Sequence, residues 1–502
     1  ETEFGRKRVI DQSSCNKDFS CLNGFCPSFV TVHGGTLKKA APVSGDGLPD
    51  IPEPEIAPLT ATHELLVTGV GGTGVVTVGA VLGMAAHLHG YGVGIIDMAG
   101  LAQKGGAVTT HMKIAPKPDD IHAIRVAAER ADTVLACDIV VAGSQKALAA
   151  IRPGASQVFV NTHEFYPGDF TRDADFTLPS RQLAEAIGKR AGKGRAHFIE
   201  AQRLASALMG DAIATNMFMV GYAWQHGGLP VSRDAIHEAI RLNGVAPQMN
   251  IAAFEWGRRA AHDPASVELA AGTRQTPDLP GDDLETLVSR RADYLTAYQD
   301  AAYAARYRAK VEMIAEAERK TMPGQTGLAQ AVARSLFKLM AIKDEFEVAR
   351  LYTDGSFERQ LAETFQNWDR LEFHLAPPLI ARRDGKGHLT KQRFGPWMMR
   401  AFKLLAAMKG LRGSWLDPFS RTAERRWERQ LLADYEQLLG TISGHLSPDN
   451  HTIGVALAAY PQKIRGFGHI KEAQADAALA ERDRLLAAFL SSEPARLAEA
   501  AE

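Results

Sequence analysis

Residues 64–90 combine a short apolar run, a cluster of glycines and a helical pattern, and this combination limits the fold more than any other feature. The run "ELLVTGV" is typical of a strand buried on both faces. In the helical stretch that follows, Gly79, Ala80 and Gly83 give a flat side that can lie close to a sheet. A further apolar segment, "YGVGIIDMAG", completes a strand–helix–strand unit. The sequence therefore predicts an α/β fold with a Rossmann-like, mostly parallel sheet and flanking helices.

The glycines of this unit suggest a binding site for phosphate groups. Gly69, Gly71 and Gly74 form a G-x-G-x-x-G pattern, with Gly72 and Thr73 inside it. Residues without a Cβ let the backbone approach a pyrophosphate, and a helix N-terminus adds partial positive charge and free N–H groups. We therefore predict that this turn binds a nucleotide or a similar cofactor. The alternative is a tight turn that binds nothing.

Two nearby segments would complete such a site. Asp97 ends the second predicted strand, 23 residues after Gly74, where an NAD site has its ribose-binding carboxylate. Lys104, Gly105 and Gly106 form a second glycine turn before another predicted strand. A lysine beside glycines can contact a phosphate or a carboxylate, although a plain surface turn is an equally open interpretation.

Three of the four cysteines lie within "CNKDFSCLNGFCPSF" near the start of the chain. Cys15, Cys21 and Cys26 are spaced closely, and Pro27 follows the last one. Iron–sulfur clusters take thiolates from such loops, and a closing Cys-Pro pair is typical of bacterial two-cluster ferredoxins. Zinc is the rival metal, but only His33 lies nearby as a further ligand. Three inert, buried thiols are the remaining alternative.

The cysteine pattern favours an iron–sulfur cluster, and a [4Fe-4S] cluster needs four ligands where this segment offers three. The chain also begins with Glu1 rather than with methionine. We therefore expect the chain to be part of a longer polypeptide, with the fourth ligand upstream of Glu1.

Composition narrows the possible partners. The 57 basic and 58 acidic residues nearly cancel, which argues against nucleic acid or a membrane surface as a partner of the whole molecule. No apolar run of about 18 residues indicates a membrane span. Four cysteines, three of them clustered, do not resemble a secreted disulfide framework, and they favour a reducing, cytoplasmic setting.

The predicted domain boundaries follow changes in composition and hydrophobic periodicity along the chain. Residues 1–35 form a partial ferredoxin-like cysteine segment, and residues 36–60 form a linker rich in proline and glycine. Residues 61–265 form the α/β domain. Residues 280–500 form a helix-rich α+β domain at the C-terminal end.

Basic residues gather at two places in this last domain: the loop 382–393, and one helix that carries Arg421, Arg425, Arg426 and Arg429. The simplest interpretation is a solvated loop and a solvated helix face. The alternative is a docking surface for an acidic partner.

Several stretches resemble a known family. "DQSSCNKDFSCLNGFCPSFVTVHGG", "GVGGTGVVTVGAVLGMAAHLHGYGVGIIDMAGLAQKGGAV" and "LMGDAIATNMFMVGYAWQHGGLP" are similar to the C-terminal part of the fused indolepyruvate ferredoxin oxidoreductases of bacteria. "KLMAIKDEFEVARLYT" and "KIRGFGHIKE" resemble the C-terminal domain of the same chains, whose function is poorly understood. The resemblance covers essentially all 502 residues.

The resemblance implies a role in the oxidative decarboxylation of 2-oxo acids. Such enzymes use thiamine diphosphate and Mg²⁺, pass electrons through [4Fe-4S] clusters to ferredoxin, and release an acyl-CoA. It implies that residues 61–265 are the gamma-type domain, that the glycine turn helps to hold CoA, and that Cys15, Cys21 and Cys26 bind a cluster. The thiamine-binding domains would lie upstream of Glu1, so turnover by this chain alone is not expected. A homo-oligomer is expected.

Two other functions are compatible with the same residues. A nicotinamide-dependent Rossmann dehydrogenase with a structural zinc would use the glycine pattern together with Asp97. A non-catalytic subunit would use the sheet and the helical tail only to support a larger assembly.

Overall fold

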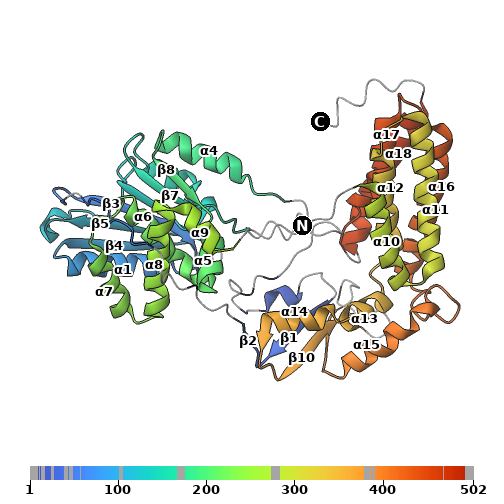
Figure 1. Cartoon of the computed structure of the whole chain (residues 1–502), viewed down its shortest axis with the longest axis horizontal. Coiled ribbons are helices and arrows are strands. Elements are labelled where there is room, and N and C mark those ends of the chain that lie inside the picture. Colours follow the sequence, from blue (N-terminus) through green and yellow to red (C-terminus); the bar gives the residue numbers. More distant parts are fainter. Residues whose placement is uncertain are drawn as a thin grey trace. The chain divides into compact units, whose positions relative to one another are not determined.

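The chain folds into two units, each with its own hydrophobic core. The structure is a computed structural model that describes residues 10, 12, 17, 19–23, 28–38, 43, 49–56, 58–100, 106–166, 176–272, 283–377, 381, 385, 390–466 and 469–491. Residues 39–275 form the first unit, here called the sheet domain. Residues 17–38 together with residues 276–502 form the second, here called the C-terminal unit. Figure 1 shows both units with their elements labelled.

The predicted apolar strand lies inside the sheet of the sheet domain, where six of its eight residues are buried. The six strands are β3 (His63–Val70), β4 (Gly92–Ala99), β5 (Ala107–Ala115), β6 (Thr133–Ala136), β7 (Gln157–Asn161) and β8 (Ala196–Ile199). Their order across the sheet is β4-β5-β3-β6-β7-β8. Only β5 runs against the other five, so the predicted mostly parallel α/β sheet is confirmed.

One feature of the sheet differs from a simple strand–helix–strand unit. The strand β5 lies between β3 and β4 and pairs with both in antiparallel register. The reason is the short connection after β4, because strands joined by a few residues pair as antiparallel neighbours. As a result, the two strands that helix α1 (Val75–Leu88) connects are not adjacent.

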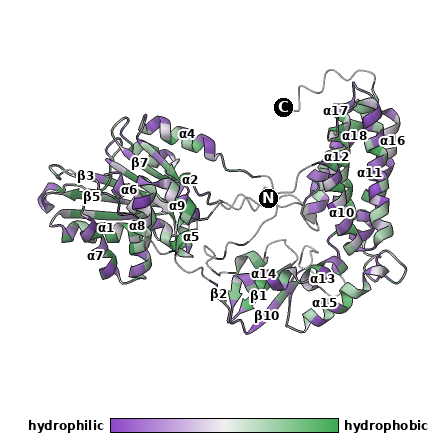
Figure 2. Cartoon of the chain, in the orientation of Figure 1, coloured by the Kyte–Doolittle hydropathy of each residue, from purple (hydrophilic) through white to green (hydrophobic). Residues whose placement is uncertain are grey.

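Helices cover both faces of this sheet, as predicted. They are α1, α2 (Ile139–Ala142), α3 (Gln145–Ala150), α4 (Ser180–Ala191), α5 (Ala201–Met209), α6 (Thr215–Gln225), α7 (Arg233–Asn243), α8 (Pro247–His262) and α9 (Pro264–Ala270). The larger core joins one face of the sheet to α1, α5, α6 and α8, and a smaller core joins the other face to α2, α3 and α4. Figure 2 shows apolar residues on both the strands and the helices of this domain.

The flat side predicted for α1 is present. A Cβ at Gly79 would lie 2.7 Å from Thr110 of β5, and one at Gly83 would lie 2.3 Å from Ile95 of β4. Both glycines therefore let the helix lie directly on the strands. Ala80 is exposed, because one residue along a helix rotates the side chain away from the sheet.

The C-terminal unit is rich in helices and also contains short strands. Its helices are α10 (Leu284–Tyr298), α11 (Ala301–Thr321), α12 (Gly327–Met340), α13 (Glu345–Thr353), α14 (Ser356–Thr364), α15 (Met398–Ala407), α16 (Ala423–His445), α17 (His451–Ala459) and α18 (His469–Leu490). Its strands are β1 (Ser28–His33), β2 (Thr36–Leu37), β9 (Phe365–Gln366), β10 (Arg370–Leu375) and β11 (Gln392–Phe394). The helix-rich α+β character predicted for this region is confirmed.

The strand that follows the cysteine segment belongs to the C-terminal unit. Strand β1 pairs with β10 in antiparallel register from Ser28 opposite Leu375 to His33 opposite Arg370. Lys391 donates a hydrogen bond of 2.6 Å to the carbonyl oxygen of Leu22, just before this strand. Sequence patterns gave no sign of this pairing, since its partners are more than 300 residues apart.

Across the described ranges, no helix has the length and apolar character that crossing a lipid bilayer requires.

Candidate functional site

The candidate site lies where the parallel strands of the sheet domain end. The glycine turn follows β3, Cys137 and Asp138 follow β6, and Asn161 is the last residue of β7. In open α/β sheets, ligands bind outside the carboxyl ends of the strands, where neighbouring connections leave a crevice. Strand β3 pairs with β5 in antiparallel register on one side and with β6 in parallel register on the other.

The glycine turn has a backbone shape that other residues would disturb. Gly72 has a φ of 88° and Gly74 a φ of 92°, both in the left-handed region that favours glycine. A Cβ at Gly72 would have no atom within 4 Å, so the space beside this residue is open. The turn thus presents its backbone to open space at Gly72.

Neighbouring segments hold the turn in place. The N–H of Gly71 donates a hydrogen bond of 2.8 Å to the carbonyl oxygen of Gly106. The side-chain amide of Asn216, on α6, donates one of 2.7 Å to the carbonyl oxygen of Thr73. The hydroxyl of Thr73 donates to the carbonyl oxygen of Val70, also at 2.7 Å. These contacts keep the turn in one conformation, which reduces the entropy that a ligand must overcome on binding.

The N-terminal end of α1 adds positive potential at the same place. Gly74 is its N-cap and offers no side-chain cap, and the first turn contains no acidic residue. Val76 and Thr77 in this turn are exposed. Because the first N–H groups of a helix lack partners within the helix, this end is suited to an anionic group.

The structure brings together most of the residues predicted for this site. Gly71, Gly72, Thr73 and Gly74 form the turn itself, and Gly69 lies at the end of β3 just before it. Gly106 contacts the turn through the bond to Gly71. Lys104 and Gly105 lie outside the described residues.

Asp97 lies apart from the turn. It aligns with Thr110 of β5, which in turn aligns with Val67 of β3. Two strand spacings separate Asp97 from β3, or about 10 Å. Its carboxylate accepts a hydrogen bond from the hydroxyl of Thr110. A ribose-binding role for Asp97 remains a prediction, and the inserted strand β5 puts the residue beside Thr110 instead of beside the glycines.

Sequence reasoning missed the buried polar residues behind the turn. Burial raises the pKa of the Cys137 thiol to about 12, with the charge of Asp138 adding to the effect. Burial also raises the pKa of Asp138 to about 6, against the backbone N–H groups that bond to its carboxylate. Asn161 donates a hydrogen bond of 3.1 Å to the carbonyl oxygen of Cys137. The only sequence signal was their place at the ends of the strand-like runs "DTVLACD" and "ASQVFVNT".

The predicted metal ligands can be followed only in part. Cys21 lies in a short 3₁₀ helix (Ser20–Asn23), exposed and without a disulfide. Cys15 and Cys26 lie outside the described residues. Within the ranges given above, no group of three His, Cys, Asp or Glu side chains is placed to hold a metal ion. Cys21 is thus available as a thiolate ligand, and the cluster itself stays a prediction.

Comparisons with known proteins agree with this arrangement. Residues 64–260 match the family model described as "Pyruvate ferredoxin/flavodoxin oxidoreductase", and residues 284–484 match a family of unknown function, DUF6537. Indolepyruvate oxidoreductase subunit IorB of Pyrococcus horikoshii is 29% identical over 204 residues, which is 40% of this chain and 96% of the relative. The subunit of the same name from Thermococcus kodakarensis is 28% identical over 204 residues, with the same coverage of 40% and 96%.

A solved structure is also similar to part of the chain. The gamma subunit of a keto/oxoacid ferredoxin oxidoreductase from Geobacter sulfurreducens PCA is 20% identical, with a TM-score of 0.29, over 40% of this chain and 98% of that chain. The family model covers the strand, glycine turn and helix described above. Residues 64–260 are therefore a domain of the pyruvate ferredoxin/flavodoxin oxidoreductase family, and the same chain continues into a domain of the DUF6537 family.

Proposed function

We propose that the sheet domain is the gamma-type part of a 2-oxo-acid ferredoxin oxidoreductase. Such an enzyme decarboxylates a 2-oxo acid, transfers the acyl group to CoA and releases two electrons. The family match over residues 64–260, which includes the glycine turn, is the observation that carries the proposal. The names of the relatives favour indolepyruvate or another aryl 2-oxo acid as the substrate.

In this proposal the glycine turn holds the diphosphate of CoA. The support is chemical: an open backbone at Gly72, a helix N-terminus without an acidic residue, and a turn braced by Asn216. Backbone N–H groups are well suited to a diphosphate because they add no side-chain entropy and sit in the positive field of α1. The role of these residues is to bind and orient CoA.

The cysteine segment is proposed to carry electrons. Cys15, Cys21 and Cys26 would be three ligands of a [4Fe-4S] cluster, which when bound passes single electrons to ferredoxin. Thiamine diphosphate and Mg²⁺ would be supplied by thiamine-binding domains outside residues 1–502. A cytoplasmic setting and a homo-oligomeric assembly belong to the same proposal.

The experiment is an assay of the chain joined to thiamine-binding domains, with indolepyruvate, CoA and ferredoxin. We expect ferredoxin reduction that requires both the 2-oxo acid and CoA. In this assay Val76→Glu should raise the KM for CoA, because a carboxylate in the first turn of α1 repels a diphosphate. The matched control Val76→Gln has nearly the same shape without the charge and should keep the KM of the parent. Reduction that does not depend on CoA would refute the proposal.

The cluster is tested separately through iron content. Cys21→Ser should lower the iron bound per chain after anaerobic reconstitution. The control Cys137→Ser should not, since the Cys137 thiol is buried and its pKa is raised to about 12. Equal iron content in both variants would remove Cys21 from the ligand set.

A further inference from the structure

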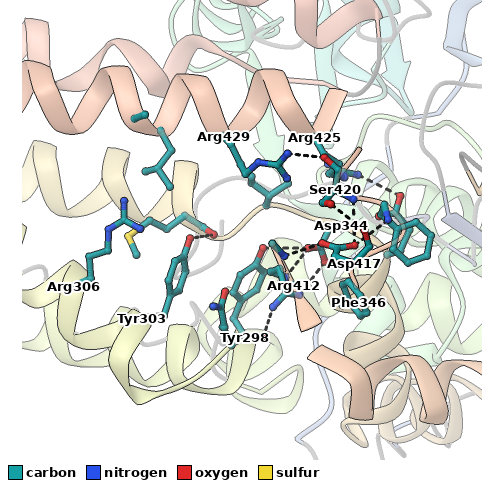
Figure 3. A pocket seen from close by; sticks show the side chains of 18 residues that line it. Tyr298, Tyr303, Arg306, Asp344, Phe346, Arg412, Asp417, Ser420, Arg425 and Arg429 are labelled. Atoms are coloured by element: carbon teal, nitrogen blue, oxygen red, sulfur yellow. Dashed lines mark hydrogen bonds and ion pairs between the residues drawn. The ribbon is translucent and has the colours of Figure 1, made fainter. Parts of the chain in front are cut away.

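A cavity opens in the C-terminal unit, far along the sequence from the glycine turn. Its volume is about 360 Å³, and its walls come from the end of α10, the start of α11, the segment 340–346, the segment 412–420 and the first turns of α16. Figure 3 shows the lining side chains, among them four arginines. Cavities of this size bind small organic molecules.

Two of these arginines form ion pairs with carboxylates. Arg412 donates hydrogen bonds of 2.6 and 2.9 Å to the two carboxylate oxygens of Asp344. Its guanidinium carbon also lies 3.7 Å from the centre of the Tyr298 ring. Arg306 donates a hydrogen bond of 2.6 Å to Glu436. Each of these two guanidinium charges is thus paired with a carboxylate.

The other two arginines retain hydrogen-bonding capacity. Arg425 and Arg429 are four residues apart on α16 and so lie on the same side of the helix. The Nε of Arg425 is buried without a hydrogen-bond partner, while its other nitrogens face Glu428 and Glu345. Arg429 donates a hydrogen bond of 2.6 Å to the carbonyl oxygen of Ser420. Among the described residues, it forms no ion pair with a carboxylate. Both guanidinium groups can therefore donate to an acceptor in the cavity.

Glu345 adds a third polar group beside these arginines. One of its carboxyl oxygens is buried without a partner, and the other lies 3.5 Å from a guanidinium nitrogen of Arg425. Burial raises the pKa of Glu345 above its ordinary value, against the attraction of Arg425. When protonated, this carboxyl group can donate a hydrogen bond to an anion.

Apolar and aromatic residues form another part of the cavity wall. Tyr298, Phe346 and Phe419 contribute rings, and the rings of Phe346 and Phe419 meet edge to face with centres 5.5 Å apart. Met340, Ile342 and Leu432 supply aliphatic surface. Such a wall favours a flat, apolar body, which buries its surface against the rings.

We propose that this cavity binds a small carboxylate with a flat apolar body, with the carboxylate on Arg425 and Arg429 and the body against the aromatic wall. A single negative charge fits better than a double one, because the carboxylates of Asp344 and Asp417 also line the cavity. The site lies within the family of unknown function, and it does not depend on the role proposed for the glycine turn.

The test is a calorimetric titration of the full chain with benzoate, benzamide and phenyl phosphate. Benzoate should bind saturably, the neutral isostere benzamide at least about tenfold more weakly, and phenyl phosphate no more tightly than benzoate. Binding of benzamide equal to that of benzoate would overturn the proposal, as would tighter binding of phenyl phosphate or no binding of benzoate.

Three variants locate the binding. Arg429→Gln should weaken benzoate about tenfold, and it removes an exposed side chain, so the fold should be kept. Ala433→Trp should abolish binding by filling the cavity that Ala433 lines. Arg426→Gln, on the same helix but outside the cavity lining, should bind benzoate like the parent. Unchanged affinity in both Arg429→Gln and Ala433→Trp, with unchanged thermal unfolding, would contradict the assignment.

Discussion

The two units of this chain build their candidate sites in different ways. In the sheet domain, the site is a backbone turn between one strand and one helix, and six neighbouring residues form most of it. In the C-terminal unit, the cavity is lined by side chains from several separate segments between residues 298 and 433. A backbone site can be recognised from a short motif, whereas a side-chain site depends on the packing of distant segments.

The same contrast holds for what stabilises each unit. In the sheet domain, α6 and α8 approach so closely that a Cβ at Gly221 would lie 1.9 Å from the carbonyl oxygen of Phe254. In the C-terminal unit, Glu318 of α11 accepts backbone N–H bonds from Leu328 and Ala329 at the start of α12, and it contacts His451 of α17 at 2.7 Å. Close backbone packing dominates the first case, and a buried polar contact between segments dominates the second.

The largest effect is expected from removing the buried carboxylate of Glu318. Glu318→Ala should lower the free energy of unfolding of the C-terminal unit by about 3–5 kcal/mol, since two backbone N–H groups and His451 lose their partner. Glu316→Ala, on the same helix with an exposed pair to Lys320, should leave this free energy nearly unchanged. Chemical denaturation, followed separately in each unit, measures the change in the free energy of unfolding for both substitutions. Equal effects of the two substitutions would contradict the claim that the buried contacts of Glu318 stabilise the C-terminal unit.

A somewhat smaller effect is expected from Gly221→Ala in the sheet domain. The added methyl group must push α6 away from α8, at a cost of about 2–3 kcal/mol. Gly188→Ala in α4 is the matched control: no atom lies within 4 Å of its Cβ position, so it should stabilise by about 0.5–1 kcal/mol. Only the sheet domain should respond in a denaturation experiment. A matching loss in the C-terminal unit would show that the two units do not unfold independently.

The smallest effect is expected from acid, through two neighbouring histidines of the sheet domain. The rings of His197 and His226 lie 4.3 Å apart, and burial lowers the pKa of His226 to about 4, with the charge of His197 adding to the effect. The folded state thus holds His226 neutral where the unfolded chain, with its ordinary pKa of 6.5, takes up a proton. Stability from this group is complete above pH 6.5 and falls as the pH drops toward 4.

The replacement His226→Phe keeps a ring at this position and removes the titration. The thermal unfolding midpoint of the sheet domain should therefore fall less steeply with acid in this variant than in the parent. An identical slope in both proteins would show that His226 does not contribute to the acid response.

The sequence predicted the sheet domain well for a physical reason. The apolar run before the glycines, the glycines themselves and the small residues on α1 all act within one short stretch, so their pattern is visible along the chain. Gly72 and Gly74 do have the positive φ values that only a glycine adopts easily. The insertion of β5 between β3 and β4 was missed because periodicity does not tell which strands become neighbours, and this is what separates Asp97 from the turn.

The C-terminal unit shows what a sequence pattern leaves out. The pairing of β1 with β10 joins segments more than 300 residues apart. Arg425 was interpreted as part of a solvated helix face, but its side chain is only 14% exposed and is held between two carboxylates. Charge runs indicate exposure on average, and tertiary packing decides which member of the run turns inward.

The most direct test of the central claim is a calorimetric titration of CoA into the chain and into Val76→Glu and Val76→Gln. The claim is that the glycine turn and the start of α1 bind the diphosphate of CoA through the backbone. The account predicts that the parent and Val76→Gln bind CoA with similar affinity and that Val76→Glu binds it at least about tenfold more weakly. Equal affinity in all three proteins, or tight binding of NADH in place of CoA, would contradict it.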